Sequence, residues 1–153
     1  SNLAQSAEVF ATWFEQALRD QAFVVLQRSD QRVLGSSRFY NINPLVPHAS
    51  IGYTWYHPDA RGTQVNPEAK LLLLTHAFEH MNLARVGFEV DSDNLRSRNA
   101  VLKLGATHEG VLRHHRYRYS DQQLSDTYTF SILRAEWPMV KAGLLARLSS
   151  ASL

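Results

Sequence analysis

The stretch from Ser50 to Leu83 constrains the fold most, because it predicts a strand, a short loop and a long helix in succession. Residues 51–56 carry the aromatic and β-branched side chains that suit a pleated surface. Pro58 ends this strand, since proline has no backbone N–H to donate to a neighbouring strand. Asn66 is a good N-cap, and Pro67 suits the first position of the helix. The stretch therefore predicts one strand–loop–helix unit.

The loop at residues 61–66 could hold an anion. Its backbone N–H groups and the start of the following helix can face a negatively charged group, and Arg61 adds a full positive charge. An ordinary strand-to-helix turn with no ligand has the same appearance. Both interpretations stay open from these residues alone.

Size and composition exclude several classes of protein. A chain of 153 residues favours one domain with a real core, and no apolar run approaches the ~20 residues that cross a bilayer. The absence of cysteine rules out disulfides, thiolate metal sites and a cysteine nucleophile. A net charge of +2 gives little support for a polyanionic partner. No secretory signal is visible, although the chain starts without methionine, and we expect a cytoplasmic protein.

Hydrophobic periodicity and turn residues divide the rest of the chain into alternating elements. The expected helices are 3–19, 67 onward, 95–104 and 135–148, and the expected strands are 22–26, 33–40, 51–56, 85–90, 111–119 and 124–133. Residues 41–48 carry two prolines and are expected to form a loop. This order predicts a mixed α/β sheet, with strands 51–56 and 85–90 as a parallel pair joined through a helix.

The most specific pattern runs from Asp93 to Arg113. It contains an Asn-x-x-Ser helix start (94–97), a Leu-Gly turn (104–105) and the string Glu-Gly-Val-Leu-Arg (109–113). This pattern resembles the GNAT superfamily of acyl-CoA N-acyltransferases, and in particular the branch of the ribosomal-protein N-terminal acetyltransferases. Matching features extend over about residues 50–148. The strand that opens the family fold has no counterpart before residue 3.

The resemblance implies one domain over residues 1–153, with a mostly antiparallel sheet that splays between strands 51–56 and 86–90. Acetyl-CoA would lie in the gap, with its pantetheine arm along the strand edge and its pyrophosphate on the loop. The cofactor contacts implied in this way are Thr54, Trp55, Tyr56, Arg61, Gly62, Thr63, Gln64, Val65, Asn66, Asn94 and Ser97. Gln64 and Asn66 stand where the family usually keeps glycine or alanine, and glycine allows a close approach of the backbone.

The family chemistry is direct attack of an amine on the thioester, assisted by a base and by an acid that protonates the thiolate. Many members carry a tyrosine acid at the position of Val101, whereas the ribosomal-protein branch implies Ser97. An exposed first-turn serine without catalytic duty is the alternative for Ser97. Ser50 replaces a glutamate that several relatives carry, so the base is open; the candidates are His48, Tyr53, His57 and Glu89.

Two other patterns suggest different functions. Residues 76–80 read His-x-x-Glu-His, which occurs in zinc proteases, but no third ligand is apparent and we expect no metal. Residues 113–119 mix basic and aromatic side chains, as single-strand nucleic-acid binders do. Polar and aromatic side chains also alternate in this way along a hairpin strand with one solvent-exposed face, so we do not expect a nucleic-acid partner.

Two functions follow as hypotheses. The first is an N-acetyltransferase that uses acetyl-CoA and a primary amine, such as a protein N-terminus or a small amine. The second is a non-catalytic acyl-CoA-binding or interaction module with a degenerate site. A second copy of the chain is a candidate partner, and a membrane is not expected.

Overall fold

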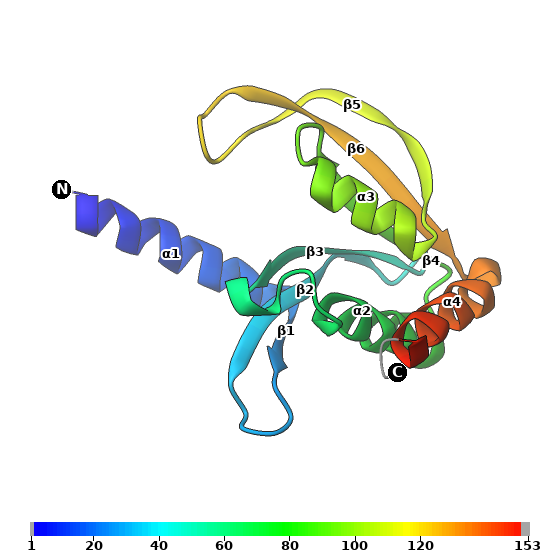
Figure 1. Ribbon diagram of the computed structural model, residues 1–153. Helices are drawn as coiled ribbons and strands as arrows, with labels where there is room; N and C mark the ends of the chain where they lie inside the picture. The colour runs from blue at the N-terminus through cyan, green and yellow to red at the C-terminus, as the bar shows by residue number, and fades with distance from the viewer. Residues whose placement is uncertain (1, 151–153) are drawn as a thin grey trace.

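The computed structural model describes residues 2–150. Its order of elements agrees with the one predicted from the sequence, as Figure 1 shows. The helices are α1 (Asn2–Arg19), α2 (Val65–Thr75), α3 (Leu95–Leu104) and α4 (Trp137–Ser150), and a π-helical turn (His76–His80) continues α2. The strands are β1 (Gln21–Leu26), β2 (Val33–Asn43), β3 (His48–Tyr56), β4 (Arg85–Asp91), β5 (Thr107–Tyr117) and β6 (Leu124–Leu133).

The six strands form one sheet in the order β1-β2-β3-β4-β6-β5, and every neighbouring pair except β3–β4 is antiparallel. The parallel pairing of β3 with β4 covers only His48–Ser50 against Arg85–Gly87. Beyond Ser50 both strands continue without pairing to each other, so the sheet opens at its centre. This arrangement confirms the mostly antiparallel sheet splayed at a parallel pair.

The hydrophobic core joins the sheet to the helices that pack on it. Its largest fully buried apolar side chains are Phe39, Leu74, Val86, Phe130, Ile132 and Leu144. The helices α2 and α4 pack against each other (Figure 1). Within residues 2–150, no helix is long and apolar enough to cross a membrane.

The helix α1 is amphipathic as predicted, but its apolar face is not buried by the described part of the chain. Phe10, Trp13, Phe14 and Leu18 are 44–69% exposed, and Ala17 is the residue of this face that is buried. Figure 1 shows why, since α1 extends away from the sheet. Its described contacts with the sheet lie in its C-terminal half, where the Arg38 guanidinium is 5.4 Å from the Trp13 ring. Periodicity therefore predicted the helix and its apolar face, but not the exposure of that face.

The predicted start of α2 was wrong. The helix begins at Val65 rather than after an Asn66 cap, and Pro67 occupies its third position. The Asn66 Oδ1 instead accepts a hydrogen bond of 2.9 Å from the Tyr56 hydroxyl. The Val65 N–H is satisfied by the Thr63 Oγ1 at 3.3 Å. Asparagine favours the N-cap position, but here the Asn66 side chain bonds to Tyr56 from β3 instead of capping its own helix.

Strand ends also differ from the sequence-based prediction. The predicted loop 41–48 shrinks to a turn, because β2 continues to Asn43 and β3 begins at His48. The strand β5 begins at Thr107 rather than at residue 111, and ends at Tyr117 rather than at residue 119. A register shift between His108 and Gly110 lets β5 keep pairing with β6 over this extra length.

Candidate functional site

The opening between β3 and β4 forms a groove of about 1570 Å³. Residues from the loop after β3 and from α2, α3, β5 and α4 complete its walls. This volume exceeds the ~300–1,000 Å³ that is usual for small-ligand pockets, so the groove suits a long ligand. Because β4 turns away after Gly87, one edge of β3 faces the groove over residues 51–56. An extended ligand can pair with such an edge as an added strand would.

A β-bulge lies where β3 borders the groove. Arg38 pairs with Gly52 and Ser36 with Trp55, so two β3 residues stand opposite the single residue Ser37. Tyr53 adopts a left-handed φ of 50° there. A bulge interrupts the regular ladder and re-aims the backbone, which is a common feature beside active sites.

Two neighbours hold Tyr53 in this unusual conformation. The Arg38 guanidinium stacks 3.5 Å from the centre of the Tyr53 ring, and the edge of Tyr40 lies 5.2 Å away, centre to centre. Arg38 is itself buried and forms a 3.4 Å ion pair with Asp20. The bulge is therefore anchored from β2 and from the segment that follows α1.

The loop after β3, where the sequence predicts an anion site, is held by its own hydrogen bonds. Gly62 adopts φ 71°, a conformation that favours glycine, and the Thr63 hydroxyl donates to the Ala60 carbonyl at 2.6 Å. The Arg61 Nε donates to the Tyr56 carbonyl at 3.1 Å, which ties the loop to the end of β3. Arg61, Gly62, Thr63, Gln64 and Asn66 line the groove, whereas Val65 does not.

The start of α3 forms the opposite wall. Of the several possible caps at residues 91–94, Asn94 is the one used, with Oδ1 accepting from the Ser97 N–H at 3.1 Å. As predicted, Gly105 ends the helix, with φ 106°. Ser97 is half-buried and lines the groove together with Asn94. Val101, in the family's tyrosine position, is an 8% exposed part of the core.

The four candidate bases separate by position. Tyr53 and Glu89 line the groove, whereas His48 and His57 do not. His48 pairs at the start of β3, before the strands diverge, and the His57 Nδ1 accepts from the Asp59 N–H at 3.2 Å. The structure therefore brings Glu89 to the site and leaves both histidines outside it. Tyr53 borders the groove, but its ring stacks on Arg38.

Glu89 is held by a partner that sequence reasoning missed. Its Oε2 lies 2.9 Å from the Arg116 Nη2, and the Arg116 Nε donates to the Thr127 Oγ1 at 3.0 Å. Arg116 lies 27 residues from Glu89 in the sequence, so no local pattern signals the pair. The segment 113–119 therefore contributes Arg116 to the groove wall, and Arg118 pairs with Asp93 and Asp121.

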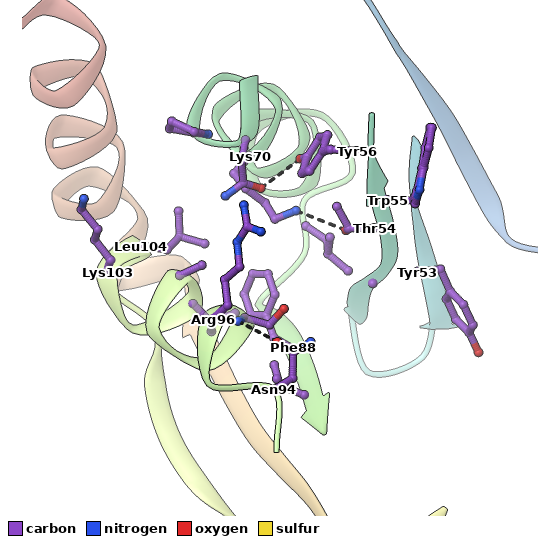
Figure 2. A pocket seen from close by; sticks show the side chains of 18 of the residues that line it. Tyr53, Thr54, Trp55, Tyr56, Lys70, Phe88, Asn94, Arg96, Lys103 and Leu104 are labelled. Atoms are coloured by element: carbon purple, nitrogen blue, oxygen red, sulfur yellow. Dashed lines mark hydrogen bonds between the residues drawn. The ribbon is translucent and has the colours of Figure 1, made fainter. Parts of the chain in front are cut away.

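Lys70 is the other groove residue that the sequence did not reveal. It reads as one polar position of α2, yet its side chain is only 7% exposed. Its Nζ donates to the Thr54 Oγ1 at 3.4 Å. Figure 2 shows Thr54 and Tyr56 pointing from β3 toward α2, while Tyr53 and Trp55 point to the other face of the strand. Burial raises the pKa of the Tyr56 hydroxyl to about 12.

The zinc-protease pattern takes part in helix packing. Glu79 accepts hydrogen bonds from the Lys141 Nζ at 2.9 and 3.0 Å and from the Trp137 Nε1 at 3.2 Å. The His76 ring packs near Phe23 and Phe39. In the part of the chain that the structure covers, no group of three or more His, Cys, Asp or Glu is placed to hold a metal ion.

Comparison with known proteins identifies the family of this fold and groove. The model of the acetyltransferase (GNAT) domain matches residues 1–107. The chain belongs to this family. The family resemblance of the sequence is thereby confirmed.

Individual GNAT relatives agree with the assignment. YdaF of Bacillus subtilis (strain 168), provisionally named a ribosomal N-acetyltransferase, is 29% identical over 108 residues, which are 71% of this chain and 57% of YdaF. A solved structure from T. thermophilus, provisionally named an acetyltransferase, is 42% identical with a TM-score of 0.71; the match covers 77% of this chain and 62% of that one.

A GCN5-related N-acetyltransferase from Brucella melitensis superposes with a TM-score of 0.81 at 26% identity, covering 90% of this chain and 62% of that one. This GNAT chain thus spans less than two thirds of the length of these three relatives.

Proposed function

We propose that this GNAT chain carries an acetyl-CoA-dependent N-acetyltransferase site that acts on a primary amine, such as a protein N-terminus. The observation that carries the proposal is the divergence of β3 and β4 after Ser50 and Gly87. It exposes one strand edge between the loop at residues 61–66 and the half-buried Ser97. An acyl-CoA has the matching parts in the same order: a pyrophosphate, a chain with two amides, and a thioester.

The proposed reaction is direct transfer. The acceptor amine first loses its ammonium proton to water, because only the neutral nitrogen has a free electron pair. That nitrogen then forms a bond to the acetyl carbonyl carbon, and the carbon–sulfur bond breaks. Ser97 gives its hydroxyl proton to the departing sulfur, and the proton lost by the amine restores that hydroxyl through water. The fixed first turn of α3, held by the Asn94 cap, keeps Ser97 at one place on the wall. The N–H groups beside the Tyr53 bulge are candidates to stabilise the carbonyl oxygen.

The acceptor is proposed to enter at the end of the groove that holds Glu89. Glu89 is about a quarter exposed, and Tyr40, Tyr53 and His115 line the same groove. A carboxylate among aromatic side chains attracts an amine that arrives protonated. The Arg116 pair fixes the Glu89 side chain, so the carboxylate is presented in one orientation. We propose that Glu89 docks the amine.

Replacing Glu89 by glutamine is expected to lower kcat/KM for the amine about 10- to 30-fold with little change in the KM for acetyl-CoA. The reason is that glutamine can still accept from Arg116 but carries no charge for the amine. Glu109→Gln is the matched control, because Glu109 pairs with Arg85 outside the groove lining. Steady-state kinetics would contradict the role if both variants kept the wild-type kcat/KM.

The activity is tested by mixing the pure protein with acetyl-CoA, a thiol reagent and a panel of amines and short peptides. The proposal expects one class of acceptor to speed CoA release above the acceptor-free rate. Mass spectrometry of that acceptor should show one added acetyl group. If no amine or peptide speeds release, the N-acetyltransferase proposal fails.

A non-catalytic acyl-CoA-binding module is the second candidate. Val101 favours it, because a core side chain occupies the position where many family members carry a tyrosine acid. Calorimetry with CoA separates the two functions. A module binds CoA without amine-dependent turnover, whereas an enzyme does both.

A further inference from the structure

Lys70 is a buried cation directed at the groove. It lies one turn after Asn66 on α2, and both residues line the groove. The Lys70 side chain is more than nine-tenths buried and reaches the Thr54 hydroxyl on β3. Thr54 already shares a 2.8 Å hydrogen bond with the Ser37 hydroxyl. Figure 2 shows the Lys70 amine between α2 and β3, with its hydrogen bond to Thr54.

The described part of the chain supplies no counter-ion for this amine. None of the ion pairs there includes Lys70, and the two carboxylates of the groove have other partners. Glu89 pairs with Arg116, while Asp91 accepts from Ser125 and lies near Arg118. Burial alone lowers the pKa of Lys70 to about 8. A buried ammonium with one long hydrogen bond is costly, and an anionic ligand would remove that cost.

The other titratable groups of the groove leave this role to Lys70. Arg61, Arg96 and Lys103 are exposed and Arg147 is half-buried, so water screens their charges more. Arg116 already has a carboxylate partner in Glu89. Tyr56, the phenol on the same side of β3, stays protonated even at about pH 9, because burial raises its pKa to about 12. Among the cations that line the groove in the described part of the chain, Lys70 is therefore the most buried.

We propose that Lys70 binds the pyrophosphate of CoA and replaces part of the backbone contact that the missing loop glycines would make. This inference rests on the proposed function. Lys70 follows Asn66 by one turn of α2, and because helix side chains lean toward the helix N-terminus, its direction favours the first turn and the loop before it. Gln64 and Asn66 carry side chains where a close backbone approach needs small residues. A full charge stabilises a phosphate over a longer distance than an N–H group does.

Proton uptake is the signature of this contact. In the protein without ligand, Lys70 is largely neutral at about pH 9, above its pKa of about 8. A bound pyrophosphate raises the pKa of Lys70 and keeps the amine protonated. CoA binding at that pH should therefore take up close to one proton. The affinity should fall as the pH rises above about 8 and level off above the pKa of the complex. The 3′-phosphate of CoA does not interfere, because its second ionisation is complete near pH 6–7.

The experiment is titration calorimetry of the whole chain with CoA at about pH 9, in two buffers of different ionisation enthalpy. We expect Lys70→Met to bind CoA about 10- to 100-fold more weakly than wild type and to take up no proton. Lys70→Arg should recover part of the affinity, again without uptake, because arginine does not titrate. Lys141→Met is the matched control, since Lys141 pairs with Glu79 away from the groove, and it should bind like wild type.

Two further readouts assign the phosphate and check the fold. If Lys70→Met weakens the binding of 3′-dephospho-CoA by the same factor as the binding of CoA, Lys70 contacts the pyrophosphate. A clearly smaller factor for 3′-dephospho-CoA would overturn this assignment in favour of the 3′-phosphate. Without ligand, Lys70→Met should melt at a higher temperature than wild type, because an uncompensated buried charge is gone. If the wild type binds CoA without proton uptake and Lys70→Met binds it equally well, the Lys70 contact is ruled out and the proposed function is not. If the wild type does not bind CoA, both the Lys70 contact and the proposed function are ruled out.

Discussion

Replacing Ser97 by alanine is expected to lower turnover about 100- to 1,000-fold while the KM for acetyl-CoA stays within about twofold. The hydroxyl is proposed to act on the sulfur only as the carbon–sulfur bond breaks, so its loss raises the barrier without weakening ground-state binding. The Asn94 cap contacts the Ser97 backbone N–H, which alanine keeps, so the helix start should be unchanged. The assay is CoA release with the best acceptor from the amine panel.

A serine in the β5–β6 turn supplies the control for this variant. Ser120 is exposed and far along the chain from α3, and Ser120→Ala should keep full activity. If Ser97→Ala also keeps full activity, Ser97 is not the acid and is an ordinary first-turn serine. If its KM for acetyl-CoA rises as much as its kcat falls, Ser97 contributes to binding rather than to proton transfer.

Replacing Gly35 by alanine is expected to destabilise the chain by about 3 kcal/mol and to weaken CoA binding. A Cβ on Gly35 would lie 2.2 Å from the Trp55 carbonyl oxygen and 2.7 Å from the Tyr56 Cδ1. The first of these atoms belongs to the backbone, so no change of rotamer relieves the clash. The strands β2 and β3 would have to separate directly behind the edge that is proposed to hold the pantetheine arm.

Gly143→Ala is the matched control for this strand variant. Gly143 lies within α4, and nothing lies within 4 Å of the position that its Cβ would take. Alanine there should stabilise the chain by about 0.5–1 kcal/mol, through helix propensity and a less flexible unfolded state. Urea unfolding measures both variants, and equal midpoints would show that the close approach of β2 to β3 does not matter.

Features with local causes were predictable from the sequence. The start and end of α3 follow from Asn94 and Gly105, whose preferred conformations act within one turn. The strand–loop–helix unit follows from aromatic and β-branched residues, then proline and polar residues, then an apolar helix. The Asn66 cap failed because the Tyr56 hydroxyl, ten residues away, offers a partner that lies outside any local pattern.

Features of the candidate site that depend on contacts between residues distant in sequence could not be predicted. The divergence of β3 from β4 decides which side chains face the groove, and this depends on pairing between strands that are distant in sequence. The Glu89–Arg116 pair and the burial of Lys70 follow from that geometry. The family resemblance supplied the position of the gap and of Ser97, which periodicity alone does not give.

The most direct test of the central claim, that the gap between β3 and β4 is an acyl-CoA site, is a crystal structure of the chain with bound CoA. We predict the pyrophosphate on the loop at residues 61–66 with Lys70 in contact, and the pantetheine arm along Thr54–Tyr56. The sulfur should lie within hydrogen-bonding distance of the Ser97 hydroxyl. CoA bound outside the gap, or a sulfur placed away from Ser97, would contradict the claim.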